Sequence, residues 1–266
     1  MLAARRHELI LQSLSRDGIV KVSDLVERLG VSDMTIRRDL AELQSQGKLE
    51  KVHGGARLRL DPATLEPGFE AKSARRTAEK DAIATCAASL VKPGAAIAVS
   101  AGTTTHALAR HLVHVPGLTV VTNSVWVADV LHRGGGEGSS VLLTGGLRTP
   151  SDALVGPLTL ASLAGLNLDA FFLGVHGMDA RAGLTTPNLL EAETNRAMVR
   201  GAARLIVVAD SSKWGLIGMA SMAALDEVDV LVTDTGLSST AAAELRDHVD
   251  ELVLVDAGAA VRQHDN

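Results

Sequence analysis

The chain has 266 residues, of which 46% are hydrophobic and 21% are charged, and its formal net charge is −5 at pH 7. This length predicts one small domain of about 60 residues and a larger one of about 200. No apolar run reaches the roughly 18 residues that span a bilayer, and Glu8 and Gln12 interrupt the N-terminal stretch that would be apolar in a signal peptide. We therefore expect a cytoplasmic protein that makes no membrane contact.

The single cysteine, Cys86, excludes an internal disulfide and any cysteine-based zinc site. We interpret Cys86 as a small buried apolar residue on a helix. The sequence predicts no metal, no cofactor and no catalytic residue.

Charge is distributed unevenly along the chain. Residues 1–60 carry 11 Lys and Arg against 8 Asp and Glu, whereas the remaining residues carry 15 against 23. A small basic segment attached to an acidic body is typical of a DNA-binding head on an effector domain.

Two helices are predicted first. Residues 3–15 have apolar residues at helical spacing, and Asp17-Gly18 ends that helix. Ser23 is expected to cap the second helix, and Gly30 to take the left-handed conformation of a sharp turn. The buried stripe of the second helix is Leu25, Val26 and Leu29.

A third helix, capped by Ser32, carries two adjacent arginines. Ile36, Leu40 and Leu43 recur at i, i+4 and i+7 and are expected to face the core. This leaves Met34, Thr35, Arg37 and Arg38 on the other faces near the N-terminal end, where a helix in the major groove contacts bases and phosphates. One arginine can bond a guanine while its neighbour meets a phosphate, and the spacing does not assign these roles.

A two-stranded wing is predicted over residues 49–52 and 56–60, joined by a turn at His53, Gly54 and Gly55. His53 either bonds its own backbone or contacts a phosphate. Positive charge along the duplex would come from Lys48, Lys51, Arg57 and Arg59.

A domain boundary follows, because Asp61-Pro62 to Pro67-Gly68 concentrates residues that disfavour helix and strand. We predict a head at 1–60, a linker at 61–74 and a body at 75–266. In the body, helical patterns at 78–91, 105–112, 125–131, 158–164 and 189–203 accompany apolar runs at 95–100, 118–122, 140–144, 170–175, 205–210, 228–234 and 251–256. This pattern predicts an α/β fold with a mostly parallel sheet covered by helices on both faces.

Polar and glycine residues follow the predicted strands, at the sheet edge where α/β proteins bind ligands. Gly102 precedes three threonines at a helix start, which suits a phosphate. The candidate ligand-binding residues are Gly102, Thr103, Thr104, Thr105, Asn123, Gly145, Gly146, Arg148, His176, Glu191, Asp210 and Lys213.

Some of these residues have a second interpretation. Asp210 is either a turn cap or an acceptor for sugar hydroxyls, and Lys213 is either solvated or a phosphate partner. His176 is either a satisfied buried histidine or a ligand contact. Of the two acids in this region, Glu191 is preferred to Glu193 as the one that faces the pocket.

The segment VSDLVERLGVSDMTIRRDLAELQSQGKLEKVHGGA resembles the helix-turn-helix of the DeoR family of bacterial sugar-metabolism regulators, and the similarity continues to about Leu254. The resemblance implies an operator-binding head and a sensor of phosphorylated sugars, usually acting as a repressor. It also implies that the body is similar in fold to ribose-5-phosphate isomerase and glucosamine-6-phosphate deaminase.

The matching segments AGTTT, VVTNS, TGG, GLTT, EAE-RAM and ADSSK-G surround the effector pocket in that family. They imply that residues 102–105 hold phosphate, while Asn123, Asp210 and Lys213 hold the sugar. This chain departs from the family pattern at Ser100, where Asp is common, and at Asn195, where Lys is common.

The leading hypothesis is therefore a repressor that binds double-stranded operator DNA and a phosphorylated sugar. An alternative is a sugar-phosphate isomerase or deaminase with an appended head, in which Asp210, Glu191 or His176 acts as the base. A DNA-architectural protein is a third reading. A palindromic operator needs two heads about 34 Å apart, so we predict a homodimer or homotetramer assembled through the body.

Overall fold

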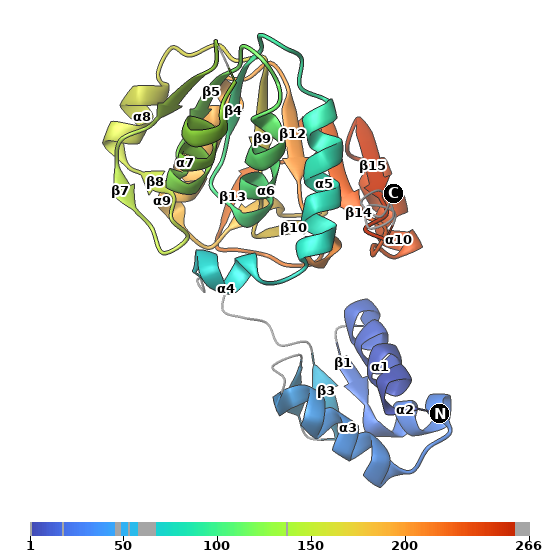
Figure 1. Cartoon of the computed structure of the whole chain (residues 1–266). Helices are drawn as coiled ribbons and strands as arrows, with labels where there is room; N and C mark the ends of the chain where they lie inside the picture. Colours follow the sequence, from blue (N-terminus) through green and yellow to red (C-terminus); the bar gives the residue numbers. More distant parts are fainter. Residues whose placement is uncertain are drawn as a thin grey trace. The chain divides into compact units, whose positions relative to one another are not determined.

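The computed structural model describes residues 2–17, 19–45, 49–52, 54–57, 68–136 and 138–258. The chain forms two compact units, Met1–Pro62 and Ala63–Asn266 (Figure 1). The predicted bounds at 1–60, 61–74 and 75–266 stay predictions. No helix in the described ranges is long and apolar enough to cross a membrane.

The first unit packs three helices against a small antiparallel sheet in the order β1-β3-β2. Its elements are α1 (Ala3–Asp17), β1 (Ile19–Lys21), α2 (Val22–Leu29), α3 (Asp33–Ser45), β2 (Glu50–Val52) and β3 (Gly55–Arg57). Ile36, Leu40 and Leu43 are fully buried, which confirms the predicted core face of α3. Gly30 ends α2 in the left-handed conformation at φ 63°, as predicted.

Two local predictions for this unit are corrected. The wing is three-stranded, because β1, too short to show a strand period, adds to β3. A Cβ at Gly55 would lie 2.1 Å from the carbonyl oxygen of Val20, so this pairing requires glycine. Ser23 does not cap α2, because β1 runs directly into the helix at Lys21 and Ser23 lies in its first turn.

The second unit is built on a parallel seven-stranded sheet in the order β15-β14-β12-β9-β4-β5-β6. Its strands are β4 (Ala96–Val99), β5 (Thr119–Thr122), β6 (Ser140–Leu143), β9 (Ala170–Leu173), β12 (Leu205–Val208), β14 (Val230–Asp234) and β15 (Glu251–Val255). The predicted parallel sheet is confirmed. Successive side chains point to opposite faces, so Phe172 packs into one core layer and Phe171 into the other.

Helices cover both faces of this sheet. The helices are α4 (Phe69–Ser73), α5 (Thr77–Ser89), α6 (Thr103–Leu112), α7 (Val125–Gly134), α8 (Pro157–Leu163), α9 (Leu189–Arg200) and α10 (Ser239–Arg246). One core layer contains buried residues of α5, α6 and α7, which lie side by side in Figure 1, and the other contains those of α8, α9 and α10. Cys86, in α5, is half-buried beside the first layer, and burial raises the pKa of its thiol.

Several short elements were not predicted. They are the antiparallel sheet β10 (Gly177–Asp179), β11 (Gly183–Thr186) and β13 (Ala220–Ala223), the hairpin β7 (Leu147–Arg148) and β8 (Leu154–Val155), the 3₁₀ turns Ser211–Lys213 and Leu225–Glu227, and the helices α4 and α10. The strands have at most four residues, too few to display a period. Helix α4 falls within the segment predicted as a linker, and its Phe69 is buried in the body.

Candidate functional site

The N-terminal half of α3 presents exposed side chains opposite its buried stripe. Met34 is 74% exposed, and Arg37 and Arg38 are exposed as well. Ser32 caps the helix, because its Oγ accepts from the backbone N–H of Thr35 at 3.3 Å. The helix therefore offers the surface that the sequence predicted.

The two arginines differ in their partners. The Arg37 Nε donates to Asp33 Oδ1 at 2.5 Å, one turn back along the same helix. No carboxylate in the described part of the chain pairs with Arg38, which shares a face with Met34 four residues earlier. Arg38 is thus available to an anion, whereas Arg37 must first leave an exposed ion pair.

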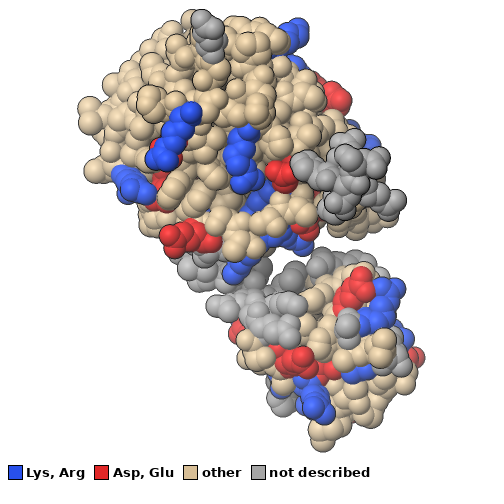
Figure 2. Space-filling view, viewed as in Figure 1, with Lys and Arg blue, Asp and Glu red and all other residues tan. Residues whose placement is uncertain are grey.

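Charges of both signs are interspersed on the first unit, as its visible face in Figure 2 shows. On the wing, Lys51 is exposed and Arg57 pairs with Glu50 at 2.8 Å. Lys48, His53 and Arg59, also predicted to contribute to this surface, lie outside the described residues.

Asp39 is a buried acid that sequence reasoning missed. It accepts hydrogen bonds from Arg6 Nε at 2.7 Å and Nη2 at 3.0 Å, and its Oδ1 lies 3.2 Å from His7 Nε2. Burial alone would raise the pKa of Asp39, but the bonds from Arg6 and His7 outweigh burial and lower it. These contacts fix α1 against α3 and so set the orientation of the arginine-bearing helix.

A polar cavity lies at the carboxyl edge of the parallel sheet in the second unit. Six of the twelve predicted ligand-binding residues line it: Gly102, Thr103, Thr104, His176, Glu191 and Lys213. The rest of the lining is Lys72, Ala101, Ser151, Gly174, Val175, Thr186, Pro187, Asn195 and Met222. The structure therefore brings together residues from α4, α6, α9, β11, β13 and the segments that connect the strands and helices.

The N-terminus of α6 forms one wall of the cavity. Gly102 occupies the N-cap position and supplies no side-chain cap, so the first backbone N–H groups of the helix need other acceptors. The positive end of the helix dipole adds to their attraction for an anion. This wall suits a phosphate group.

Two lysines and one carboxylate complete the charged lining, namely Lys72, Lys213 and Glu191. Lys72 was not among the predicted residues, because it lies in α4 and not at the end of a strand. The excess of positive charge favours an anionic ligand, and the carboxylate can accept from ligand hydroxyls.

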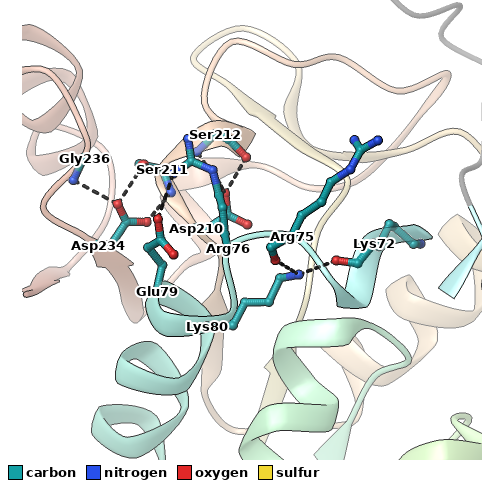
Figure 3. Close-up of polar contacts among 10 residues, drawn as sticks. All are labelled: Lys72, Arg75, Arg76, Glu79, Lys80, Asp210, Ser211, Ser212, Asp234 and Gly236. Atoms are coloured by element: carbon teal, nitrogen blue, oxygen red, sulfur yellow. Dashed lines mark hydrogen bonds and ion pairs between the residues drawn. The ribbon is translucent and has the colours of Figure 1, made fainter. Parts of the chain in front are cut away.

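A buried lysine fixes the turn that carries Lys72. The Lys80 ammonium donates to the backbone carbonyls of Lys72 at 2.5 Å and of Arg75 at 2.6 Å (Figure 3). Burial lowers the pKa of Lys80, although the nearby charge of Asp210 opposes that shift. Next to it, Arg76 Nε lies 3.6 Å from Asp210, so α5 and the end of β12 are joined at this point.

Glu191 and Asn195 lie one turn apart on α9. Glu191 Oε1 accepts from the hydroxyls of Thr149, at 2.7 Å, and Ser151, while Oε2 accepts from Thr186 at 3.2 Å. Asn195 is buried and donates from Nδ2 to Met222 Sδ at 3.1 Å. Its Oδ1 has no hydrogen-bond partner among the described groups.

The other predicted residues do not line this cavity: Thr105, Asn123, Gly145, Gly146, Arg148 and Asp210. Thr105 is fully buried and its hydroxyl donates to the Gly102 carbonyl at 3.0 Å. Asp210 is buried and caps the turn that follows β12, accepting from the Ser212 backbone at 3.1 Å. Arg148 is exposed and pairs with Asp152 at 2.8 Å.

The Asn123 side chain links the backbones of two separate segments. Its Oδ1 accepts from the backbone of Ala101 at 3.0 Å and its Nδ2 donates to the Leu154 carbonyl at 3.1 Å. Ser100, the other departure from the family pattern, accepts from the backbone of Gly174 at 2.9 Å. Both residues therefore bind backbone groups of lining residues, Ala101 and Gly174, at the ends of strands.

A helix-turn-helix unit that exposes two adjacent arginines, followed by an α/β unit with an anion-adapted cavity, defines a DNA-binding regulator with a ligand-sensing body. Residues 6–60 match the DeoR-like helix-turn-helix domain, and residues 75–235 match the DeoR C-terminal sensor domain. The chain belongs to the DeoR family of transcriptional regulators.

Two relatives match over nearly their whole length. The HTH-type transcriptional regulator GlpR of Haloferax volcanii is 37% identical, covering 92% of this chain and 95% of its own. The glycerol-3-phosphate regulon repressor of Escherichia coli K12 is 32% identical, covering 96% of this chain and 100% of its own. The family and these relatives are regulators, so the alternative of an isomerase or deaminase is not favoured.

Among solved structures, ribose 5 phosphate isomerase A from Neisseria gonorrhoeae matches with a TM-score of 0.37 and 15% identity, covering 52% of this chain and 53% of that one. The beta subunit of eIF2B from Chaetomium thermophilum matches with a TM-score of 0.42 and 14% identity, covering 65% and 54%.

Proposed function

We propose that this chain represses sugar-metabolism genes by binding operator DNA, and that a phosphorylated sugar in the cavity lowers its affinity for that DNA. Such a protein works where the chromosome lies, which in a cell without a nucleus is the cytoplasm. The observation that carries the proposal is the cavity lining, in which the N-terminus of α6, Lys72 and Lys213 face the same space as Glu191.

The chemistry of the lining divides the ligand into two ends. Helix N–H groups and lysines suit a phosphate, and Glu191 suits the hydroxyl groups of a sugar. Asn195 offers an amide where a lysine is common in the family, so we propose that the end near α9 binds an uncharged group. A sugar monophosphate fits this division better than a bisphosphate.

We propose that α3 enters the major groove of DNA and presents Met34, Thr35, Arg37 and Arg38 to it. The residues that contact the DNA phosphates are then Ser32, Lys51 and Arg57. Lowering DNA affinity a hundredfold requires the sugar phosphate to favour the non-binding arrangement by about 2.7 kcal/mol. A few charge-assisted hydrogen bonds made in one arrangement only can supply this.

Thermal melting tests ligand binding directly. We expect a sugar monophosphate at 100 times its Kd to raise the melting temperature of the second unit by roughly 5 °C. The screen uses fructose 1-phosphate, fructose 6-phosphate, glucose 6-phosphate and glycerol 3-phosphate, with the unphosphorylated sugars and inorganic phosphate as controls. Equal shifts from sugars with and without phosphate would contradict the proposed anion site.

We also propose a homodimer or homotetramer, because two heads are needed to read a palindromic operator. Strand β6 is an edge of the sheet, and Leu142 and Leu143 within it are exposed. Thr159 donates to the Gly145 carbonyl at 2.5 Å, which places α8 and its exposed Leu158 beside the end of β6. A two-fold contact places the same surface of two subunits against each other, so like charges there would repel. The exposed leucines of β6 carry no charge and are therefore compatible with self-association.

Charging this edge should dissociate the assembly. We expect Leu142→Asp combined with Leu143→Asp to give a monomer by analytical ultracentrifugation at micromolar concentration, because like charges would oppose each other across the axis. Leu254→Asp, on the opposite edge strand β15, is the matched control and should leave the mass unchanged. An unchanged mass in the double variant would exclude β6 from the contact.

A further inference from the structure

An aromatic cluster holds α4, the first described helix of the second unit. Phe69, at the start of α4, is buried, and its ring stacks on Trp126 of α7 with centroids 5.2 Å apart and planes at 15°. The ring of His106, in α6, meets the same Phe69 in an edge contact at 5.5 Å. The position of α4 therefore depends on the position of the Trp126 indole.

A strained residue fixes that indole. Trp126 Nε1 donates to Asp152 Oδ2 at 2.7 Å, and Arg148 Nε donates to the other carboxylate oxygen at 2.8 Å. Asp152 has a φ of 64°, a left-handed conformation that costs energy for residues other than glycine, although Asp and Asn adopt it more readily than the rest. Burial alone would raise the pKa of Asp152, but the bonds from Trp126 and Arg148 lower it.

The turn that contains Asp152 is tied to the cavity. The backbone N–H of Asp152 donates to the Thr149 carbonyl at 2.9 Å, so the two residues belong to one turn. The hydroxyls of Thr149 and Ser151 in that turn both donate to the same oxygen of Glu191. Ser151 and Glu191 line the cavity.

We infer that occupation of the cavity is transmitted to α4 through this turn, with Asp152 and Trp126 as positioning residues. The inference rests on the proposed function, since it concerns how a bound sugar phosphate changes DNA affinity. The path runs from Glu191 to the 149–153 turn, then through the Asp152–Trp126 hydrogen bond to Phe69.

The physical basis is competition for one carboxylate oxygen. A ligand hydroxyl that donates to Glu191 displaces the hydroxyl of Thr149 or Ser151, which removes a restraint on the strained turn. The turn can then relax, Asp152 moves away from the indole, and Trp126 changes its stacking on Phe69. Helix α4 is the first described element of the second unit, so its movement is the change that we infer is passed along the chain to the first unit.

A bound ligand can also act on α4 directly, without the 149–153 turn, because Lys72 of α4 itself lines the cavity. The variant Trp126→Phe separates the two routes, since it keeps a ring on Phe69 and leaves Lys72 intact but removes the N–H donor. We expect this variant to bind DNA without ligand, and to bind the sugar phosphate, within about threefold of wild type. The factor by which the ligand lowers DNA affinity should be at least ten times smaller in this variant than in wild type.

Two substitutions at Asp152 provide matched variants. Asp152→Gly accepts the left-handed backbone but offers no acceptor, so it should lose coupling like Trp126→Phe. Asp152→Asn also tolerates that backbone and keeps an oxygen for the indole, so it should retain most of the coupling. Arg133→Gln, at the far end of α7, is the control and should behave as wild type.

The measurement is fluorescence anisotropy of a labelled DNA duplex, selected by the wild-type protein from a random pool, with and without the sugar phosphate that gives the largest thermal shift. In Trp214→Phe, Trp126 is the one remaining tryptophan, and its emission should change on saturation with that ligand. Wild-type coupling retained by Trp126→Phe and Asp152→Gly would overturn this inference alone. If no sugar phosphate changed the DNA affinity of the wild-type protein, both the proposed function and this inference would be overturned.

Discussion

Arg38→Ala is expected to weaken binding to the selected DNA duplex by roughly 10- to 100-fold, since a guanidinium contact with a base is worth about 1 to 3 kcal/mol. Arg38 is exposed, has no carboxylate partner in the described residues, and lies on the same face of α3 as Met34. Anisotropy titrations against the selected duplex and a random duplex measure the effect.

Salt dependence separates the two roles that Arg38 could have. A base contact predicts a loss confined to the selected duplex, whereas a phosphate contact predicts equal losses on both duplexes and a salt slope reduced by about one. Arg133→Ala, an exposed arginine of α7, is the control and should bind as wild type. If Arg38→Ala bound both duplexes with unchanged affinity, the proposed position of α3 in the DNA interface would be contradicted.

Lys213→Gln is expected to weaken sugar-phosphate binding by roughly 10- to 100-fold, because one charge-assisted hydrogen bond to the phosphate is lost. DNA binding without ligand should stay unchanged, so the variant should remain on DNA at ligand concentrations that release wild type. Isothermal titration calorimetry and anisotropy measure the two affinities.

The exposed Lys92, outside the cavity, provides the matched substitution Lys92→Gln. It removes the same charge from the body and should have no effect on either affinity. A response to the ligand that is identical in Lys213→Gln and Lys92→Gln would show that Lys213 does not hold the phosphate.

The periodic elements of this fold could be predicted because their signals are local. Ile36, Leu40 and Leu43 mark one face of α3, and Gly30 marks the turn before it. The runs that form β4 and β12 are apolar throughout because both faces of the parallel sheet are covered. These patterns depend only on residues a few positions apart.

Contacts between distant segments could not be predicted in the same way. Asp39 meets Arg6 across 33 positions, and no spacing rule connects them. Lys72 reaches the cavity because Lys80, buried beneath its turn, binds the backbone there. The strands around Gly183 are too short to show a period, so the sheet that completes the second unit was missed.

The candidate cavity was predicted in part for the same reason. The rule that ligands bind at strand ends located Gly102, His176 and Lys213, which line the cavity. It also selected Asn123 and Asp210, which lie at strand ends but turn their side chains to backbone groups. Position along the chain indicates the edge of the sheet, whereas the packing of each loop decides which side chains face the cavity.

The most direct test is a titration of wild-type protein on its selected duplex at fixed salt, repeated with each sugar phosphate, its parent sugar and inorganic phosphate. We predict that at least one sugar monophosphate lowers DNA affinity about 100-fold while its parent sugar does not. DNA affinity that stays constant with every sugar phosphate, despite sequence-specific binding, would contradict the account of the second unit as a sensor.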